Sequence, residues 1–283
     1  TPVRKGSEVR ISPGFRTVAG DETSSGPTLW IRGWEHRTPP GGATLALHLA
    51  GPWTLLGHWR ARRQYTWASG QASLKEILTF VLARAGLGLA VLSNSATFTD
   101  HKPAFTLSPG ESGAQAAHRL LATTPDVLLF RGTTAYVRYC QTSDATDYAY
   151  GAGHAILQGR YEQRASERNR VQAFGSAGMG EAFDWEDVEA TYDVLLQVHD
   201  LNLDTQTKAQ DRGNALLRKE QMGALSGDLV VPVNCGQELY DVVEINDARA
   251  GLSAARRRVI EIGLGYDRQG KARYQQRLTL GGV

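Results

Sequence analysis

Short stretches of alternating hydrophobic and polar residues occupy the beginning of the chain. Three of them share this pattern: residues 8–11, 29–34 and 44–49. Turn sequences containing proline and glycine follow the first stretch at 12–14 and separate the other two at 39–42. Alternation at this spacing is typical of short antiparallel strands. We therefore predict a first small β-barrel over residues 1–60.

The hydrophobic spacing changes to a helical one in the next part of the chain. Ser73 and Glu76 form a capping box, and apolar residues then recur at three- and four-residue intervals. A second helix is predicted over residues 111–122, and a β-hairpin over residues 127–139. These elements predict an α+β module (helix, helix, hairpin) over residues 61–142, inserted after the first barrel.

Strand patterns return in the second half, after a polar stretch at residues 143–153. The predicted strands are residues 155–161, 170–174, 192–203, 228–233, 239–246, 254–263 and 273–280. A helix is predicted near residues 205–222, because Asp204 or Thr205 can cap it. The fold class predicted for the chain is therefore β-rich α+β: two small antiparallel β-barrels, the second over residues 143–283, with an inserted α+β module.

The two ends of the chain resemble each other in outline. Residues 6–11, 29–34 and 45–49 near the start follow the same order of strands as residues 240–245, 259–262 and 278–280 near the end. We interpret this as a weak internal repeat of the kind that two related barrels leave.

The composition of the chain argues against several classes of function. The 283 residues carry a formal net charge of only +2, which argues against a dedicated nucleic-acid binder. The chain contains only two cysteines, Cys140 and Cys235, without metal-type spacing, and no apolar run long enough to cross a bilayer. The first residue is Thr1 rather than Met, so we expect further residues upstream.

None of the usual catalytic signatures is present in the sequence. The glycine-rich stretch at residues 175–180 lacks the lysine of a phosphate-binding loop, and the seven histidines form no zinc-binding pair. We predict no enzyme activity, no catalytic, cofactor-binding or metal-binding residues, and no cofactor.

Three groups of residues keep alternative functions open. Five carboxylates could supply a glycosidase pair or form a solvated acidic segment: Asp184, Glu186, Asp187, Glu189 and Asp193. The stretch 200–204 begins like a calcium loop but has Thr205 and Asp211 where glycine and glutamate are needed. Five tryptophans could form a sugar platform or fill a core: Trp30, Trp34, Trp53, Trp59 and Trp67.

The order of these elements resembles the baseplate hub family of tailed phages, the late-control D type. The segments that carry this resemblance are residues 6–11, 30–33, 73–86, 105–107, 111–121, the hairpin ending at Tyr139, 169–175, the helix from Thr205, 227–233, 242–245, 257–262 and 278–281. The resemblance implies a homotrimer that forms a ring in the virion tail and is assembled in the host cytoplasm. The ring joins the tail tube and distal tail proteins to a central spike or fibre. A carbohydrate-binding or carbohydrate-cleaving tail protein is the alternative.

Overall fold

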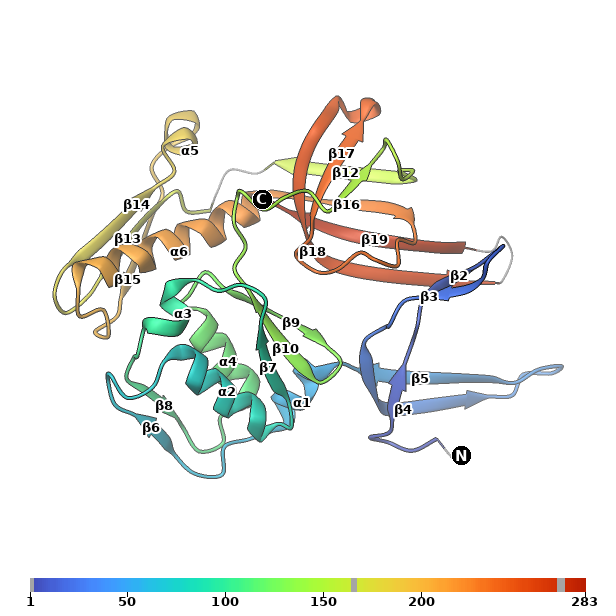
Figure 1. Cartoon of the computed structure of the whole chain (residues 1–283), viewed down its shortest axis with the longest axis horizontal. Coiled ribbons are helices and arrows are strands. Elements are labelled where there is room, and N and C mark those ends of the chain that lie inside the picture. Colours follow the sequence, from blue (N-terminus) through green and yellow to red (C-terminus); the bar gives the residue numbers. More distant parts are fainter. Residues whose placement is uncertain (1–2, 164–166, 269–272) are drawn as a thin grey trace. The chain divides into compact units, whose positions relative to one another are not determined.

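The computed structural model describes residues 3–163, 167–268 and 273–283, so Thr1 and Pro2 at the start of the predicted first barrel lie outside the described residues. The chain divides into two compact units. The first comprises Thr1–Ala122 and Asp126–Tyr139, and the second Thr123–Pro125 and Cys140–Val283. Figure 1 shows the first unit in blue to green and the second in green to red. No helix among the described residues has the length and apolar character needed to cross a membrane.

The first unit begins with two small β structures. One is an antiparallel sheet in the order β1-β4-β5, formed by Glu8–Arg10, Thr28–Arg37 and Thr44–Ala50. The other is a hairpin of β2 (Gly14–Thr17) and β3 (Gly20–Thr23). A bulge interrupts the β4–β5 register between Ile31 and Gly33. Beyond the bulge, β4 and β5 continue as a two-stranded ribbon (Figure 1).

The rest of the first unit is an α+β module. Its helices are α1 (Pro52–His58), α2 (Leu74–Arg84), α3 (Ala96–Asp100) and α4 (Gly113–Leu121). Its strands are β6 (Tyr65–Trp67), β7 (Gly88–Val91), β8 (Phe105–Leu107), β9 (Val127–Arg131) and β10 (Thr134–Arg138). The strands β7, β10 and β9 form a mixed sheet, and β6 pairs with β8. Helix α2 contacts α3, α4 and β7, so this module contains the main core of the unit.

Helix α2 confirms the strongest sequence prediction. The hydroxyl of Ser73 accepts the Glu76 amide proton, and the Glu76 carboxylate accepts the Ser73 amide proton, at 3.3 and 2.7 Å. The buried face consists of Leu74, Ile77, Leu78, Val81 and Leu82. Gly86 follows the last turn with φ +75°, a conformation that glycine adopts without steric cost.

The second unit contains a six-stranded sheet in the order β11-β17-β18-β19-β16-β12. These strands are Tyr148–Tyr150, Val242–Asp247, Leu252–Asp267, Arg273–Gly281, Leu225–Pro232 and Gln158–Gln163. The pair β11–β17 is parallel and the other neighbours are antiparallel. A short 3₁₀ turn, η1 (Ala248–Ala250), joins β17 to β18. Side chains from all six strands meet in one apolar cluster, as expected for a strongly curled sheet.

A side-chain bridge across the curled sheet links strands that are not neighbours. The Tyr161 hydroxyl on β12 donates a 3.0 Å hydrogen bond to Asp247 at the end of β17, although three strands separate β12 from β17. The backbone of the sheet stays open, because no described pairing joins its end strands β11 and β12. The sheet is therefore a half-barrel whose inner face is bridged by a tyrosine.

This bridge gives a prediction for alkaline pH. Burial and the bond to Asp247 raise the pKa of Tyr161 to about 12 from the ordinary 10.0. A raised folded-state pKa contributes stability that is complete below pH 10 and is lost as pH rises toward 12, because the unfolded chain ionises first. We expect the stability advantage of the wild type over Tyr161→Phe to shrink over this range, as measured by urea denaturation at a series of pH values. An advantage that stays constant up to pH 12 would contradict the assignment.

The remainder of the second unit is a smaller mixed sheet covered by a helix. Its order is β14-β13-β15, from Met179–Phe183, Arg170–Phe174 and Leu195–His199. Between β14 and β15 the chain forms the short helix α5 (Trp185–Ala190). The long helix α6 (Gln206–Ala224), N-capped by Thr205, contacts β13 and β14.

The predicted β-rich α+β class is confirmed, but the two closed antiparallel barrels are not observed. Among the described strands, residues 1–60 form an open three-stranded sheet and a separate hairpin. Residues 143–283 form a half-barrel with one parallel pair, plus the smaller mixed sheet. The first sheet stays open because the chain between β1 and β4 forms the β2–β3 hairpin, whose strands pair only with each other.

The predicted internal repeat agrees with the topology. The strands β1, β4 and β5 adjoin in the same antiparallel order as β17, β18 and β19. Each set has a bulge between its second and third strand, between Ile31 and Gly33 in the first and between Val259 and Glu261 in the second. In the second set, the strands β11, β16 and β12 extend the sheet, whereas no additional described strand pairs with the first set.

Candidate functional site

The acidic stretch around α5 has mainly structural contacts. Asp184 caps α5 by accepting the Asp187 amide proton at 3.2 Å, and its other oxygen accepts a bond from Gln221. Asp187 accepts a 2.9 Å bond from Asn169, and Asp193 pairs with an arginine of β13. These contacts give Asp184, Asp187 and Asp193 a role in positioning the loop.

Asn169 is fully buried and forms hydrogen bonds to this loop. Its amide nitrogen donates to Asp187 and to the carbonyl of Tyr192, at 2.9 and 2.8 Å. Its side-chain oxygen accepts the Val194 amide proton at 2.7 Å. Its backbone carbonyl accepts the Asp184 amide proton. Asn169 therefore contacts both ends of the segment 184–194, with its backbone carbonyl at Asp184 and its side chain at Val194.

The calcium-like stretch forms a turn before α6. Asp200 accepts both the backbone and the side-chain N–H groups of Asn202, each at 3.0 Å. Asp204 pairs with Lys208 one helical turn further on. Within residues 3–163, 167–268 and 273–283, no group of three or more His, Cys, Asp or Glu side chains could hold a metal ion.

The five tryptophans of the first unit do not share one surface. Trp30 is buried in β4, Trp53 stacks on His118 with ring centroids 4.9 Å apart, and Trp67 packs edge-on against a phenylalanine of α2. Only Trp34 projects into solvent, with an exposed fraction of 53%. The structure thus supports core filling for most of this cluster.

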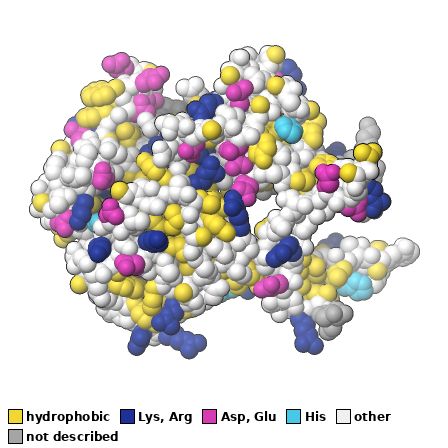
Figure 2. Space-filling model, in the orientation of Figure 1, with side chains coloured by type: hydrophobic (Ala, Val, Ile, Leu, Met, Phe, Trp, Pro, Cys, Tyr) yellow, Lys and Arg dark blue, Asp and Glu magenta, His cyan; other side chains and the backbone are white. Residues whose placement is uncertain are grey.

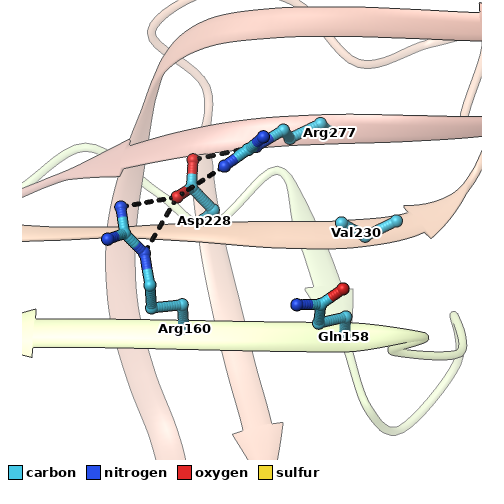
Figure 3. Close-up of a pocket in the computed structure, with 5 residues that line it drawn as sticks. All are labelled: Gln158, Arg160, Asp228, Val230 and Arg277. Carbon is cyan, nitrogen blue, oxygen red and sulfur yellow. Dashed lines mark hydrogen bonds and ion pairs between the residues drawn. The ribbon is translucent and has the colours of Figure 1, made fainter.

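A shallow pocket of about 110 Å³ lies over three strands of the half-barrel and is lined by Gln158, Arg160, Asp228, Val230 and Arg277 (Figure 3). The Asp228 carboxylate bonds to both arginines, at 2.7 Å to Arg160 and 3.0 Å to Arg277. The bond from Arg277 and that from Arg160 lower the pKa of Asp228 below its ordinary value, against the effect of burial. The pocket is therefore occupied by an ion-pair ladder that joins strands and offers no free acid or base.

Exposed apolar side chains on the β4–β5 ribbon form the first candidate contact surface. Trp34 lies opposite Leu47 in the register, and His36 lies opposite Leu45. Alternation places these four side chains on one face of the ribbon. Trp34, Leu45 and Leu47 are all exposed. We call this set the ribbon face.

A second apolar surface lies on the long strand β18. Ile262 packs against the half-barrel core, and Leu264 and Tyr266 follow on the same side of the strand by alternation. Leu264 and Tyr266 are exposed, and Tyr266 packs edge-on against Tyr274 of β19. The inner face of the half-barrel therefore continues into solvent as an apolar strip.

The sequence interpretation missed several exposed residues of this kind. Leu264 and Tyr266 alternate with Gly263 and Gly265, which could have indicated an uncovered strand. Trp185 lies inside the acidic stretch, far in sequence from the other five tryptophans. No periodic signal separates it from a buried aromatic residue, because α5 is only six residues long.

Comparisons with known proteins identify relatives by fold alone. No family model matches the chain, and no curated protein matches it. The 43 kDa tail protein of prophage MuSo2 from Shewanella oneidensis matches with a TM-score of 0.67 at 10% identity, over 98% of this chain and 90% of that one. A tail protein from Neisseria meningitidis matches with a TM-score of 0.70 at 14% identity, over 97% and 86%.

A third match comes from a secretion system. An E. coli component of the type VI secretion system, described as structurally similar to the T4 tail proteins gp27 and gp5, has a TM-score of 0.58 at 10% identity. The match covers 96% of this chain and 64% of that one. The resemblance to tail proteins predicted from the sequence is thus confirmed at the level of the fold.

Proposed function

We propose that this chain is a non-enzymatic structural subunit of a phage-type tail or injection-machine baseplate, where it forms the hub. The observation that carries the proposal is the fold shared with a tail protein over 98% of this chain and 90% of that one. The shared fold spans nearly the whole of the given chain, which supports a structural role for it.

The proposed hub is a homotrimeric ring in the virion tail, assembled in the host cytoplasm. It joins the tail tube and distal tail proteins to a central spike or fibre. The domain roles that we propose are a first barrel from residues 1–60, an inserted module from 61–142 and a second barrel from 143–283. The observed sheets support barrels that are completed only on assembly, because sheet edges with unpaired N–H and C=O groups readily accept another strand.

The ribbon face is our proposed contact between subunits. An exposed apolar patch of this kind marks a protein–protein interface in a soluble chain, and aromatic residues are enriched in the cores of interfaces. We propose that the ribbon face of one subunit contacts Leu264 and Tyr266 on β18 of the next. The two surfaces differ, so the association is heterologous, and it forms a ring when the rotation from one subunit to the next closes.

Solution mass tests this proposal. We expect light scattering to give a trimer of about 92 kDa, three times the 30.8 kDa of one chain, and negative-stain images to show a ring with a central hole. The variant Leu45→Asp with Leu47→Asp should be monomeric, because burying two carboxylates at the interface is strongly unfavourable.

A matched control is Val18→Asp with Phe15→Asp, which introduces the same two charges at exposed positions of the β2–β3 hairpin. This control should remain trimeric. A wild-type chain that stays monomeric at high concentration, or a Leu45/Leu47 variant that still forms the ring, would contradict the proposed subunit contact.

A further inference from the structure

Two segments of the chain carry net charges of opposite sign. Residues 52–139, the α+β module, contain nine Lys and Arg but four Asp and Glu, a formal charge of +5. Residues 167–224, the smaller sheet with α5 and α6, contain six Lys and Arg but eleven Asp and Glu, a formal charge of −5. The whole chain has a net charge of only +2. Two segments of opposite charge therefore exist on one nearly neutral chain.

The basic surface contains a strip in which arginines alternate with aromatic rings. The guanidinium of Arg63 lies 5.2 Å from the ring centroid of Tyr65. That of Arg84 lies 5.8 Å from Tyr65 and 4.8 Å from Phe80. Arg62, which precedes Arg63 in the sequence, is exposed. We call Arg62, Arg63, Tyr65, Phe80 and Arg84 the arginine–aromatic strip.

The arginines of this strip lack acidic partners in the described part of the chain. No ion pair with a carboxylate is formed there by Arg62, Arg63 or Arg84, whereas Arg119 of the same module pairs with Glu111. Arginine held over an aromatic ring keeps its planar N–H donors free for a carboxylate. The guanidinium groups of the strip are thus available to bind the carboxylates of a partner outside their own unit.

The acidic surface has the complementary composition. Trp185 stacks on Phe183 with ring centroids 4.4 Å apart, and Trp185 and Tyr192 have exposed fractions of 61% and 70%. Glu186 and Glu189 lie between them and form no ion pair within the residues that the structure describes. We call Trp185, Glu186, Glu189 and Tyr192 the acidic tip. Figure 2 shows acidic and hydrophobic side chains together over α5.

The tip is held in place before any partner binds. The buried Asn169 contacts both ends of the segment 184–194, as described above. A preorganised loop loses little entropy on binding, so its exposed aromatic rings can contribute directly to affinity. Tryptophan, tyrosine and arginine are the residues most enriched at the energetic centres of interfaces.

We propose that the acidic tip of one copy of this chain docks on the arginine–aromatic strip of a neighbouring copy. This inference rests on the proposed function, since it assumes that copies assemble, and it adds a second contact to the apolar ribbon face. Charge complementarity identifies the occupant: each surface carries unpaired charges of the sign that the other lacks, together with exposed or half-buried aromatic rings. The two surfaces belong to different units, so the contact is heterologous, and it repeats around a ring when the rotation between neighbouring copies closes.

Charge reversal on each side tests this contact. One variant reverses the strip (Arg62→Glu with Arg63→Glu), another reverses the tip (Glu186→Lys with Glu189→Lys), and a third combines all four changes. We expect each separate reversal to weaken self-association at least about tenfold in sedimentation experiments, and the combined variant to recover most of the loss. The wild-type association should also weaken with added salt.

The matched control is Lys75→Glu with Lys102→Glu. It changes the charge of the same module by the same amount at exposed positions outside the strip. We expect the control to associate like the wild type. A loss of association as large as that of the strip variant would overturn the specific contact, because net charge alone would then explain both.

The remaining outcomes separate the possible failures. A wild type that assembles, with every reversal variant assembling equally well, overturns this inference and leaves the proposed function standing. A wild type that never assembles overturns both. Reversals that lower the melting temperature without changing association assign the contact to a single chain and overturn the proposal. So does a strip reversal that abolishes binding of a fluorescent oligothymidylate while leaving association intact, because the strip would then be a nucleic-acid surface.

Discussion

Arg258→Met should lower the free energy of unfolding by about 3 kcal/mol, because it removes a fully buried guanidinium from an ion pair and takes a donor from each of its partners. The Arg258 side chain on β18 has an exposed fraction of 0% and lies 3.0 Å from the Asp144 carboxylate. It also donates to the carbonyls of Gln141 and Tyr240, each at 2.8 Å. Urea denaturation of the full chain measures the change.

The effect should be large because Arg258 holds the chain segment that enters the second unit. Residues 140–147 run along β17 and β18, where Arg256 adds bonds to the carbonyls of Thr142 and Asp144. Asp147 accepts the Val242 amide proton at 2.9 Å and directs the chain into β11. Without Arg258, the carbonyls of Gln141 and Tyr240 and the Asp144 carboxylate each lose a donor that is itself fully buried.

Two further variants test this explanation. Arg277→Met removes an arginine that also pairs with a carboxylate, but its side chain is 63% exposed, so we expect a loss of about 1 kcal/mol or less. Adding Asp144→Leu to Arg258→Met should recover part of the stability, because the unpaired carboxylate is removed. A loss below that of Arg277→Met would contradict the role of Arg258.

The local elements of the first unit could be predicted because their signals are local. Ser73, Glu76 and the apolar stripe after them determine α2 through contacts within one or two turns. The helix predicted at residues 111–122 appears as α4, and Ser112 and Gln115 form a second capping box that the prediction did not use. The short helices α1, α3 and α5 were missed because five to seven residues carry too little periodicity to distinguish a helix from a loop.

Sheet closure could not be predicted because it depends on partners distant in sequence. Alternation identifies a strand and its two faces, but it does not say whether the edge strands meet. The Tyr161–Asp247 bridge joins residues 86 positions apart, and nothing in either local pattern indicates it. The same limit explains the candidate surfaces: alternation predicted which residues of β4 and β5 share a face, but not that Trp34 and Leu45 stay uncovered.

Gly180 is a position in the second unit where a single methyl group should have a large effect, because it faces the backbone of α6. A Cβ atom there would lie 2.2 Å from the backbone nitrogen of Gln210 and 2.2 Å from the carbonyl carbon of Ala209, both in α6. Backbone atoms of a helix cannot turn aside as a flexible side chain can, so α6 must move away from β14. We expect Gly180→Ala to destabilise the chain by about 3 kcal/mol, the upper end of the usual cost of overpacking, as measured by urea denaturation.

Gly213 on α6 provides the control, because it faces the same strand without the close approach. Its nearest neighbour would be the Ala182 side chain at 3.7 Å, an ordinary contact. Gly213→Ala should therefore be neutral or stabilise the chain by up to about 1 kcal/mol, since alanine favours a helix. If both substitutions cost the same, the position of α6 on β14 would be contradicted. If only Gly180→Ala is costly, then the close packing of α6 on β14 stabilises the small sheet. The strand β14 of that sheet leads into the acidic tip.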